Sequence, residues 1–516
     1  MKTPVYHQHE EFQNRTQKLH ELRQAGVDPY PAKYAPEHTT AQLRKHAEEA
    51  SPGNSEAAEK GETPFVSIAG RLMLYRSMGK NSFAHIQDAT GQMQVMFNRD
   101  LTVWRGCGAL DARNMEKKLD LGDLVGLTGN LFLTHKGELT LFVKEAVLLS
   151  KTLLPLADKH AGLVDKELRY RKRWLDLIAH PEVAELFRMR SRILREIRRF
   201  LDGQQFLEVE TPILQNLYGG AEARPFETHL HALDQEMFLR ISPELSLKKL
   251  LIGGMDRIYE MGKVFRNEGI DRNHNPEFTL LEAYAAYWDY FDAMECVEKL
   301  FEHLALALFG TTQIPYRLQE GEEIQFLELK APWKRISMKE SLKVYAGLDV
   351  DGMSEEEIRR CLETSGRCHP DKLQHLNRGL MIAALFEVKV EPFLIQPHHI
   401  FDHPIETTPL CKPHRDPIRK QEGLVERFES FILCQEVCNA YSELNDPELQ
   451  RKLLEMQAAR RDAGDEEASP LDETFLEAMC QGMPPAAGFG IGIDRLVMIL
   501  TQAHSIRDVL YFPWMK

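Results

Sequence analysis

A short strand and the loop after it carry charged side chains that could bind phosphate. In residues 265–268, Arg266 and Glu268 are two positions apart, so a β-strand places both side chains on one face. The polar, turn-prone stretch that follows, 269–276, supplies further cations and hydrogen-bond donors: Arg272, His274 and Asn275. An arginine guanidinium matches phosphate or carboxylate oxygens as a planar fork, so this strand–loop–strand unit suits a polyphosphate. The alternative is a purely structural pair between Arg266 and Glu268.

Two further predicted strands combine carboxylates with tyrosines. In strand 277–286, alternation puts four side chains on one face: Phe278, Leu280, Glu282 and Tyr284. In strand 428–443, one face carries Asn439, Tyr441 and Glu443. A carboxylate among apolar and aromatic groups is costly unless something neutralises it. A cationic ligand would complete this set, because an ammonium needs several acceptors. The alternative is that these groups bond only to one another or to neighbouring backbone.

A glycine-rich segment near the C-terminal end joins a predicted strand to a predicted helix. Residues 488–495 read Gly-Phe-Gly-Ile-Gly-Ile-Asp-Arg, and Arg495 falls in the first turn of the helix. The glycine spacing differs from the fingerprint of a dinucleotide-binding fold, and the chain has no GxxxxGK[ST] loop. By itself, the segment indicates either a ligand site or tight packing of a strand against a helix.

These side chains need a scaffold that brings distant segments together. Apolar residues at helical spacing predict an amphipathic helix over 183–201, with one face formed by Leu186, Ile193, Ile197 and Phe200. Strands are predicted at 206–210, 257–265, 277–286, 428–443 and 488–493. Because helical segments lie between them, we expect a predominantly antiparallel sheet flanked by helices.

The N-terminal third has a different pattern. Residues 1–63 look helical and polar, whereas residues 64–150 contain about five short alternating strands separated by turns. This pattern predicts a small barrel of the OB type, which commonly binds single-stranded nucleic acid. We therefore expect an α+β multidomain chain with a helical extension (1–63), an OB barrel (64–150), a linker (151–174) and a large α+β domain (175–516).

Composition limits the possible functions. The chain has 516 residues, 43% of them hydrophobic and 28% charged, which is ordinary for a globular protein of several domains. It has no apolar run that could span a membrane and no signal-peptide core at the N-terminus, so we expect a cytosolic protein. The net charge of −14 argues against a non-specific nucleic-acid coat but allows a local basic surface.

Three segments together resemble the motifs of class II aminoacyl-tRNA synthetases. Residues 206–212, which end in Thr-Pro, resemble motif 1, residues 265–268 motif 2 and residues 488–495 motif 3. An OB domain before these motifs marks the subgroup for aspartate, asparagine and lysine. Within that subgroup, the strings at 219–226, 266–269, 274–278 and 442–446 resemble the lysine-specific members of the bacterial type. The chain departs from the pattern at Gln205, where motif 1 usually has glycine.

The resemblance implies a role for each candidate side chain. ATP would be bound by Arg266, Glu268, His274, Asn275, Phe278, Glu436 and Arg495, with Arg266 and Arg495 as the catalytic residues. Lysine would be bound by Gly220, Glu244, Arg266, Glu282, Tyr284, Asn439, Tyr441 and Glu443. Mg²⁺ would be held by Glu429 and Glu436. Their odd spacing puts these two acids on opposite faces of a single strand unless a bulge or bend intervenes.

The implied ligands are ATP, L-lysine and tRNA(Lys), and the implied assembly is a homodimer built on helix 183–201 and the strand before Pro212. In the OB domain, the residues expected to read the anticodon are Arg71, Phe83, Gln94 and Glu138. Phe83 would stack on a base, while Gln94 and Glu138 would bond to base edges. The alternative for Phe83 is a place in the barrel core.

The implied reaction is activation of lysine by ATP to lysyl-adenylate, followed by transfer to the 3′ end of tRNA. One alternative is an enzyme of the same subgroup that activates aspartate or asparagine, but a carboxylate side chain would need a facing cation rather than an acidic wall. A second is a non-catalytic RNA-binding relative, which the presence of Arg266, Glu436 and Arg495 argues against. A third is a transferase of lysine to protein, which the OB domain argues against.

Overall fold

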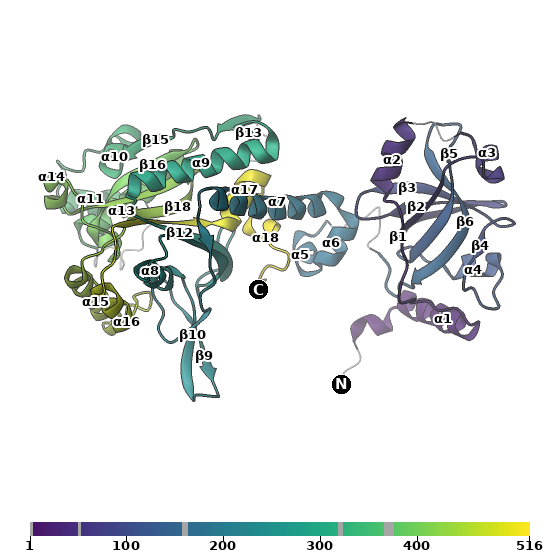
Figure 1. Cartoon of the computed structure of the whole chain (residues 1–516), viewed down its shortest axis with the longest axis horizontal. Helices are drawn as coiled ribbons and strands as arrows, with labels where there is room; N and C mark the ends of the chain where they lie inside the picture. Colours follow the sequence, from purple (N-terminus) through teal and green to yellow (C-terminus); the bar gives the residue numbers. More distant parts are fainter. Residues whose placement is uncertain (1–3, 50–52, 157–163, 318–322, 366–375, 516) are drawn as a thin grey trace. The chain divides into compact units, whose positions relative to one another are not determined.

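The computed structural model of the chain describes residues 4–49, 53–156, 164–317, 323–365 and 376–515 (Figure 1). Backbone contacts divide the chain into two compact units, Met1–Arg169 with Trp174–Pro181, and Tyr170–Arg173 with Glu182–Lys516. Residues 174–181 therefore pack with the first unit. Part of the expected linker, 157–163, lies outside the described residues. Among the helices that are described, none combines the length and apolar character needed to cross a bilayer.

The first unit is built on a closed five-stranded barrel, which confirms the prediction from the alternating strands. The sheet order is β3-β2-β1-β5-β6, with β4 at the far side of β6, and a parallel pairing of β3 with β6 closes the barrel. Its strands are β1 (Phe65–Met78), β2 (Asn81–Gln87), β3 (Gln92–Asn98), β4 (Val103–Trp104), β5 (Leu124–Leu133) and β6 (Leu139–Ser150).

The N-terminal extension belongs to the barrel unit. Its elements and the helix inserted before β5 are η1 (Val5–Gln8), α1 (Glu10–Gln24), α2 (Thr40–Glu49), α3 (Ser55–Lys60) and α4 (Ala112–Lys118). Leu22 of α1 and Leu43 of α2 are buried in the same apolar cluster as Ile68 and Val95 of the barrel. These helices therefore complete the barrel core, and α2 borders the barrel surface at Gln92, whose carbonyl oxygen accepts a hydrogen bond from Arg44.

The second unit is built on an eight-stranded sheet in the order β15-β16-β17-β18-β19-β12-β11-β7. All neighbours are antiparallel except β15–β16 and β7–β11, so the prediction of a predominantly antiparallel sheet is confirmed. The strands are β7 (Leu207–Glu208), β11 (Arg257–Phe265), β12 (Glu277–Ala286), β15 (Lys334–Ser337), β16 (His398–Pro404), β17 (Leu424–Ile432), β18 (Gln435–Ser442) and β19 (Ala486–Gly492).

Alternation along the central strands separates a buried core from a functional face. Leu281 and Ala283 of β12 and Ile491 of β19 face an apolar cluster shared with α7 (Pro181–Gly203), α9 (Tyr290–Phe309) and α17 (Ile493–Thr501). Figure 1 shows these helices along one side of the strands and α8 (Glu244–Ile252) on the other. The even-numbered residues of β12 and β19 therefore face α8, and this face carries the candidate site.

The remaining elements lie outside the eight-stranded sheet. A helical insertion between β15 and β16 forms its own apolar cluster against Ile400 and Phe431. The full set of remaining elements is α5 (Lys166–Arg171), α6 (Arg173–Ala179), β8 (Leu214–Gln215), β9 (Phe226–Leu230), β10 (Gln235–Leu239), β13 (Gln313–Tyr316), β14 (Gln325–Glu328), α10 (Met338–Ala346), α11 (Glu355–Ser365), α13 (Arg378–Lys389), η2 (Glu391–Phe393), η3 (Ile405–Thr407), α14 (Pro417–Gln421), α15 (Pro447–Asp462), α16 (Glu473–Cys480) and α18 (Ile506–Val509).

Two details of the strand prediction are wrong. The predicted strand 428–443 is two strands, β17 and β18, because Leu433 and Cys434 both adopt left-handed φ angles (51° and 59°) and turn the chain back. The predicted strand 206–210 is reduced to Leu207–Glu208. Gln205, before it, has a φ of 64°. That backbone region favours glycine, which explains the usual residue of motif 1 at this position.

Candidate active site

A cavity of about 530 Å³ opens on the functional face of the sheet, in the second unit. Every residue expected to bind ATP, lysine or Mg²⁺ lines it. These residues are Gly220, Glu244, Arg266, Glu268, His274, Asn275, Phe278, Glu282, Tyr284, Glu429, Glu436, Asn439, Tyr441, Glu443 and Arg495. Segments more than 200 residues apart in the chain, such as those with Arg266 and Arg495, therefore contribute to one cavity.

One end of the cavity is rich in cations. The guanidinium carbon of Arg266 lies 5.1 Å from the ring centre of Phe278, so the arginine and the aromatic ring form a stacked pair. Arg495 donates to the backbone oxygen of Glu436 at 2.8 Å and to Nε2 of His274 at 3.2 Å. These contacts hold the two guanidinium groups at the cavity wall, where they could bind phosphate oxygens.

A chain of hydrogen bonds assigns the tautomer of His274. Because Nε2 of His274 accepts from Arg495, the ring proton lies on Nδ1, which donates to Asp271 Oδ2 at 2.9 Å. Asn275 is 8% exposed and its Nδ2 donates to the carbonyl oxygen of Glu277. Its Oδ1 is buried without a hydrogen-bond partner among the described residues, so it is available to a ligand.

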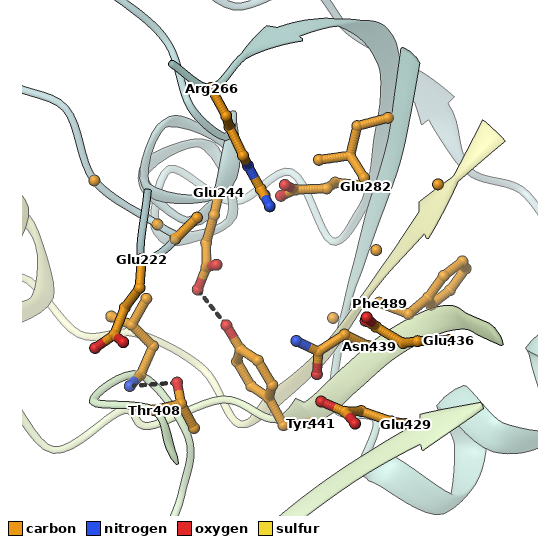
Figure 2. Close-up of a pocket in the computed structure, with 18 of the residues that line it drawn as sticks. Glu222, Glu244, Arg266, Glu282, Thr408, Glu429, Glu436, Asn439, Tyr441 and Phe489 are labelled. Carbon is orange, nitrogen blue, oxygen red and sulfur yellow. Dashed lines mark hydrogen bonds between the residues drawn. The ribbon is translucent and has the colours of Figure 1, made fainter. Parts of the chain in front are cut away.

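The other end of the cavity is an acidic wall, formed by Glu244, Glu282 and Glu443. These side chains are buried, with exposed fractions of 5%, 5% and 1%. Glu282 accepts from the Ser242 hydroxyl at 2.7 Å and from the Tyr284 hydroxyl at 2.9 Å. The Tyr441 hydroxyl donates to Glu244 at 2.6 Å, as Figure 2 shows. The tyrosines beside this wall therefore donate to its acids.

Glu443 differs from the other two acids because neither of its oxygens has a hydrogen-bond partner among the described residues, and only Oε2 has an ion-pair partner, Lys248. A buried carboxylate oxygen without a donor is expensive, so Oε1 marks a position for a cationic ligand. Burial raises the pKa of Glu443 to about 8, against the opposing effect of Lys248. Burial and the charge of Glu244 raise the pKa of Glu282 to about 7.

Two glycine positions pack closely against this wall. A β-carbon at Gly488 would lie 2.3 Å from the Tyr284 ring and 2.5 Å from Glu443 Oε1. Gly220 has a φ of 85°, and a β-carbon there would lie 2.9 Å from the Glu244 side chain. At Gly490, by contrast, the nearest atoms would be 3.8 Å away. Gly488 and Gly220 therefore make room for the carboxylates, which gives the glycine-rich segment a physical reason.

Sequence reasoning missed two buried cations beside the wall. Lys248, on α8, lies between Glu244 and Glu443, one turn of helix after Glu244. That spacing of four residues is a signal that could have found it. Arg427, on β17, donates to Asn439 Oδ1 at 3.0 Å and to Glu429 at 2.6 Å.

The bond from Arg427 changes the expected role of Asn439. Sequence reasoning placed Asn439 among the acceptors for an ammonium, but its oxygen is already bonded to Arg427. Figure 2 shows the amide nitrogen of Asn439 turned towards Tyr441 and Glu244. Asn439 therefore offers the cavity a donor, which suits a carboxylate or a phosphate rather than an ammonium.

The two acids expected to hold Mg²⁺ lie on neighbouring strands. Glu429 is on β17 and Glu436 on β18, and a register shift falls between Ser430 and Phe431. The bend that their odd spacing required is thus present, and Figure 2 shows both side chains at the same end of the cavity. Within the described ranges, no group of three or more His, Cys, Asp and Glu side chains could hold a metal. Two carboxylates fit Mg²⁺ when substrate phosphates and waters supply its other ligands.

The barrel unit has a separate cavity of about 480 Å³. It is lined by two of the expected anticodon residues, Gln94 and Glu138, and by His85 and Arg44, which sequence reasoning missed. Gln94 Nε2 donates to the Thr140 hydroxyl at 2.9 Å, so Oε1 is the side-chain atom with which Gln94 could accept from a base.

The other two expected anticodon residues do not line this cavity. Phe83 is partly buried against an apolar cluster that contains Met96 and Phe142. Arg71 donates to the carbonyl oxygen of Gly122 at 2.7 Å. Gln94 and Glu138 are therefore brought together, whereas Phe83 lies two residues from the lining residue His85 on β2 and Arg71 does not line this cavity.

Comparison with known proteins agrees with this geometry. Residues 165–516 match the family of class II tRNA synthetases (D, K and N), and residues 66–149 match the OB-fold nucleic acid binding domain. The chain is 54% identical to the lysine–tRNA ligase of Chlamydia pneumoniae, over 99% of this chain and 97% of that protein. It is 46% identical to the lysine–tRNA ligase of Moorella thermoacetica, over 97% of both. The chain belongs to the class II tRNA synthetase family.

Proposed function

We propose that this chain is a lysine–tRNA ligase, which joins L-lysine to tRNA(Lys) with the energy of ATP. The observation that carries the proposal is the buried, unpartnered Oε1 of Glu443 within an acidic wall, in the part of the chain that the structure describes. The side-chain ammonium of lysine supplies the donor that this oxygen lacks. Relatives named lysine–tRNA ligase, matched over nearly their whole length, support the same substrate.

The acids of the wall bind different ammonium groups of lysine. Glu443 and Glu282 bind the side-chain ammonium, and the lone pairs of the Tyr284 and Tyr441 hydroxyls complete its shell. Glu244 binds the α-ammonium beside Gly220, where the absence of a side chain leaves room. The carboxylate of lysine then points towards Arg266 and the Asn439 amide.

The cationic end of the cavity binds ATP. Phe278 stacks against one face of adenine, and Arg495 lies against the other face of the base. Glu268, His274 and Asn275 also contact the nucleotide. Arg266 binds both the α-phosphate and the lysine carboxylate, so it aligns the two reacting groups. Glu429 and Glu436 hold Mg²⁺, which neutralises charge on the phosphates when it is bound.

The reaction needs no protein nucleophile. A carboxylate oxygen of lysine attacks the α-phosphorus, and the bond to the bridging oxygen breaks to release pyrophosphate. The 3′-terminal hydroxyl of tRNA then attacks the carbonyl carbon of lysyl-adenylate and releases AMP. Arg266 and Arg495 contribute by positioning and by stabilising negative charge that develops on the phosphate.

The barrel unit supplies the tRNA contacts. Gln94 and Glu138 read base edges in the barrel cavity, Arg44 adds a cation at its border, and Phe83 and Arg71 contact the anticodon loop outside this cavity. We also infer a cytosolic homodimer. Apolar side chains around motif 1 support this interface because they are exposed in the single chain: Leu207, Ile213, Leu214 and Leu217.

ATP–pyrophosphate exchange with a panel of amino acids tests the proposal. Lysine should support exchange, whereas aspartate and asparagine should not. Glu443 would repel the side-chain carboxylate of aspartate, and asparagine has no side-chain charge to pair with Oε1 of Glu443. Exchange with aspartate or asparagine instead would assign the chain to another member of the subgroup. No exchange with any amino acid would favour a non-catalytic RNA-binding protein.

A further inference from the structure

Lys248 is a deeply buried ammonium beside the acidic wall. Its side chain is fully buried, and its Nζ lies 2.6 Å from Oε1 of Glu244 and 2.5 Å from Oε2 of Glu443. It also lies 5.4 Å from the ring centre of Tyr441. Burial alone would lower the pKa of Lys248, but the two carboxylates raise it above its ordinary value. Lys248 is therefore a fixed positive charge.

The contacts of Lys248 leave one oxygen of Glu443 for a ligand. Oε2 of Glu443 faces Lys248, while Oε1 remains without a hydrogen-bond partner among the described residues. Gly488 allows this orientation, because a β-carbon there would overlap Oε1. Lys248 thus determines which oxygen of the Glu443 carboxylate faces the cavity.

Lys248 also sets the charge of the wall. Three ionised carboxylates, Glu244, Glu282 and Glu443, would give a charge of −3, and Lys248 reduces it to −2. A basic amino acid brings two ammonium groups. The wall and such a ligand therefore neutralise each other, which removes the large cost of an uncompensated buried charge.

We propose that Lys248 is a positioning residue for substrate recognition. It orients the Glu443 carboxylate towards the ligand, and it sets the net charge of the wall to match the charge of a basic amino acid. This inference rests on the proposed function, because it takes lysine as the ligand. Lys248 itself touches neither the substrate nor the reacting atoms. It acts through Glu443 and Glu244, with whose carboxylates it forms ion pairs.

The other groups around Glu443 do not replace this charge. The titratable side chains that face it are Glu244 from α8, Glu282 and Tyr284 from β12, Tyr441 from β18 and Cys411 from the loop before α14. Among the cations that line the cavity, Arg266 lies towards Glu282 (Figure 2) and Arg427 donates to Glu429 and Asn439. Lys248 is the cation that opposes the rise in the pKa of Glu443 caused by burial.

Lys248→Met tests the inference, because methionine keeps the length of the side chain and removes its charge. Without Lys248 the pKa of Glu443 should rise further, so the carboxylate should ionise only at higher pH. Lysine binding needs the ionised carboxylate, so the lysine KM in pyrophosphate exchange falls as pH rises. In the variant this fall should move to higher pH by about one unit or more. The lysine KM should be about tenfold above wild type at pH 7, and the difference should shrink by pH 9.

The control is Lys249→Met, which removes the neighbouring lysine of α8. Lys249 pairs with Asp472 at 3.2 Å and is partly exposed, so the pH profile for lysine should match wild type. The ATP KM of both variants should stay within about twofold of wild type, since neither lysine contacts the cationic end. A Lys248→Met variant whose lysine KM changes by the same factor at every pH would show that Lys248 only fills space.

A double variant covers the case in which Lys248→Met folds poorly. Adding Glu443→Gln to Lys248→Met returns the net charge of the wall to −2. The double variant should therefore melt at a higher temperature at pH 8 than the single variant Lys248→Met. Additive losses of stability would overturn the inference. Failure of wild type to activate lysine would overturn the proposed function instead, whereas normal lysine activation with an unchanged pH profile in Lys248→Met would overturn only this inference.

Discussion

The backbone of Gly488 lies against the carboxylate of Glu443, so closely that a β-carbon on Gly488 would be 2.5 Å from Oε1. The two residues come from different segments, β19 and the end of β18. A ring atom of Tyr284 would lie 2.3 Å from the same β-carbon. The glycine-rich segment therefore shapes the acidic wall as well as joining a strand to a helix.

Gly488→Ala should damage the lysine end of the cavity. The added methyl group must displace the Tyr284 ring or the Glu443 carboxylate, and overpacking of this kind costs about 1–3 kcal/mol. Thermal denaturation should show a lower Tm than wild type. Gly490→Ala is the matched control on the same strand, because its nearest neighbours would be 3.8 Å away. Equal Tm values for the two variants would contradict the close packing at Gly488.

Stabilisation of the protein by lysine should grow as pH rises. Burial raises the pKa of Glu282 to about 7 and of Glu443 to about 8, from an ordinary value of 4.5. Their contribution to stability without ligand is fully present below about pH 4.5 and is lost as pH rises through the folded-state pKa values. Lysine supplies the missing positive charge, so its effect on Tm should be larger at pH 8.5 than at pH 6.

Norleucine is the matched ligand for this experiment, because it has a carbon chain of the same length as that of lysine and lacks the side-chain ammonium. Its effect on Tm should not increase over the same pH interval. A lysine effect that is independent of pH would show that the two acids do not change their protonation when lysine binds.

Arg44→Ala should weaken tRNA charging without affecting lysyl-adenylate formation. Arg44 lines the barrel cavity with Gln94 and Glu138, in a different compact unit from the cavity with Arg266. Loss of one phosphate contact should reduce the salt dependence of tRNA binding by about 0.7 in logarithmic slope. Lys45→Ala, on the next residue of α2, should leave both measurements near wild type. Equal losses in the two half-reactions would show that Arg44 only stabilises the fold.

The protein should sediment as a dimer at micromolar concentration. Leu207 and Leu214 near motif 1 are about half exposed in the single chain (54% and 46%), and an obligate interface would bury such side chains. Leu214→Glu should therefore shift the sedimentation coefficient towards that of a monomer, because a charge would enter an apolar interface. A stable, active wild-type monomer would refute the dimer.

Much of this site could be predicted from strand alternation. The period of two along β12 placed Phe278, Glu282 and Tyr284 on one face, and the structure has them on that face. The barrel followed from the same kind of pattern. Long segments with a clear period and apolar faces fix their own structure, since burial enforces the alternation.

The rest depends on contacts between distant segments. At Leu433 and Cys434 the chain turns through left-handed backbone at residues that are not glycine, so the local sequence did not predict this turn. The bond that turns Asn439 comes from Arg427 on a neighbouring strand. The partner of Lys248 across the wall, Glu443, lies almost 200 residues away in the chain. Such pairings exist only once the sheet has formed.

Pyrophosphate exchange by wild type and Glu443→Gln, with lysine and norleucine as substrates, tests the central claim that the acidic wall selects lysine. The substituted amide keeps the shape of the side chain but loses the charge that pairs with the ammonium, and a charge-assisted hydrogen bond contributes about 1.5–3 kcal/mol. The variant should show a lysine KM raised by about 10- to 100-fold, an ATP KM near wild type and a weaker preference for lysine over norleucine. A variant that keeps the lysine KM and still rejects norleucine would contradict the assignment of Glu443 to the lysine site.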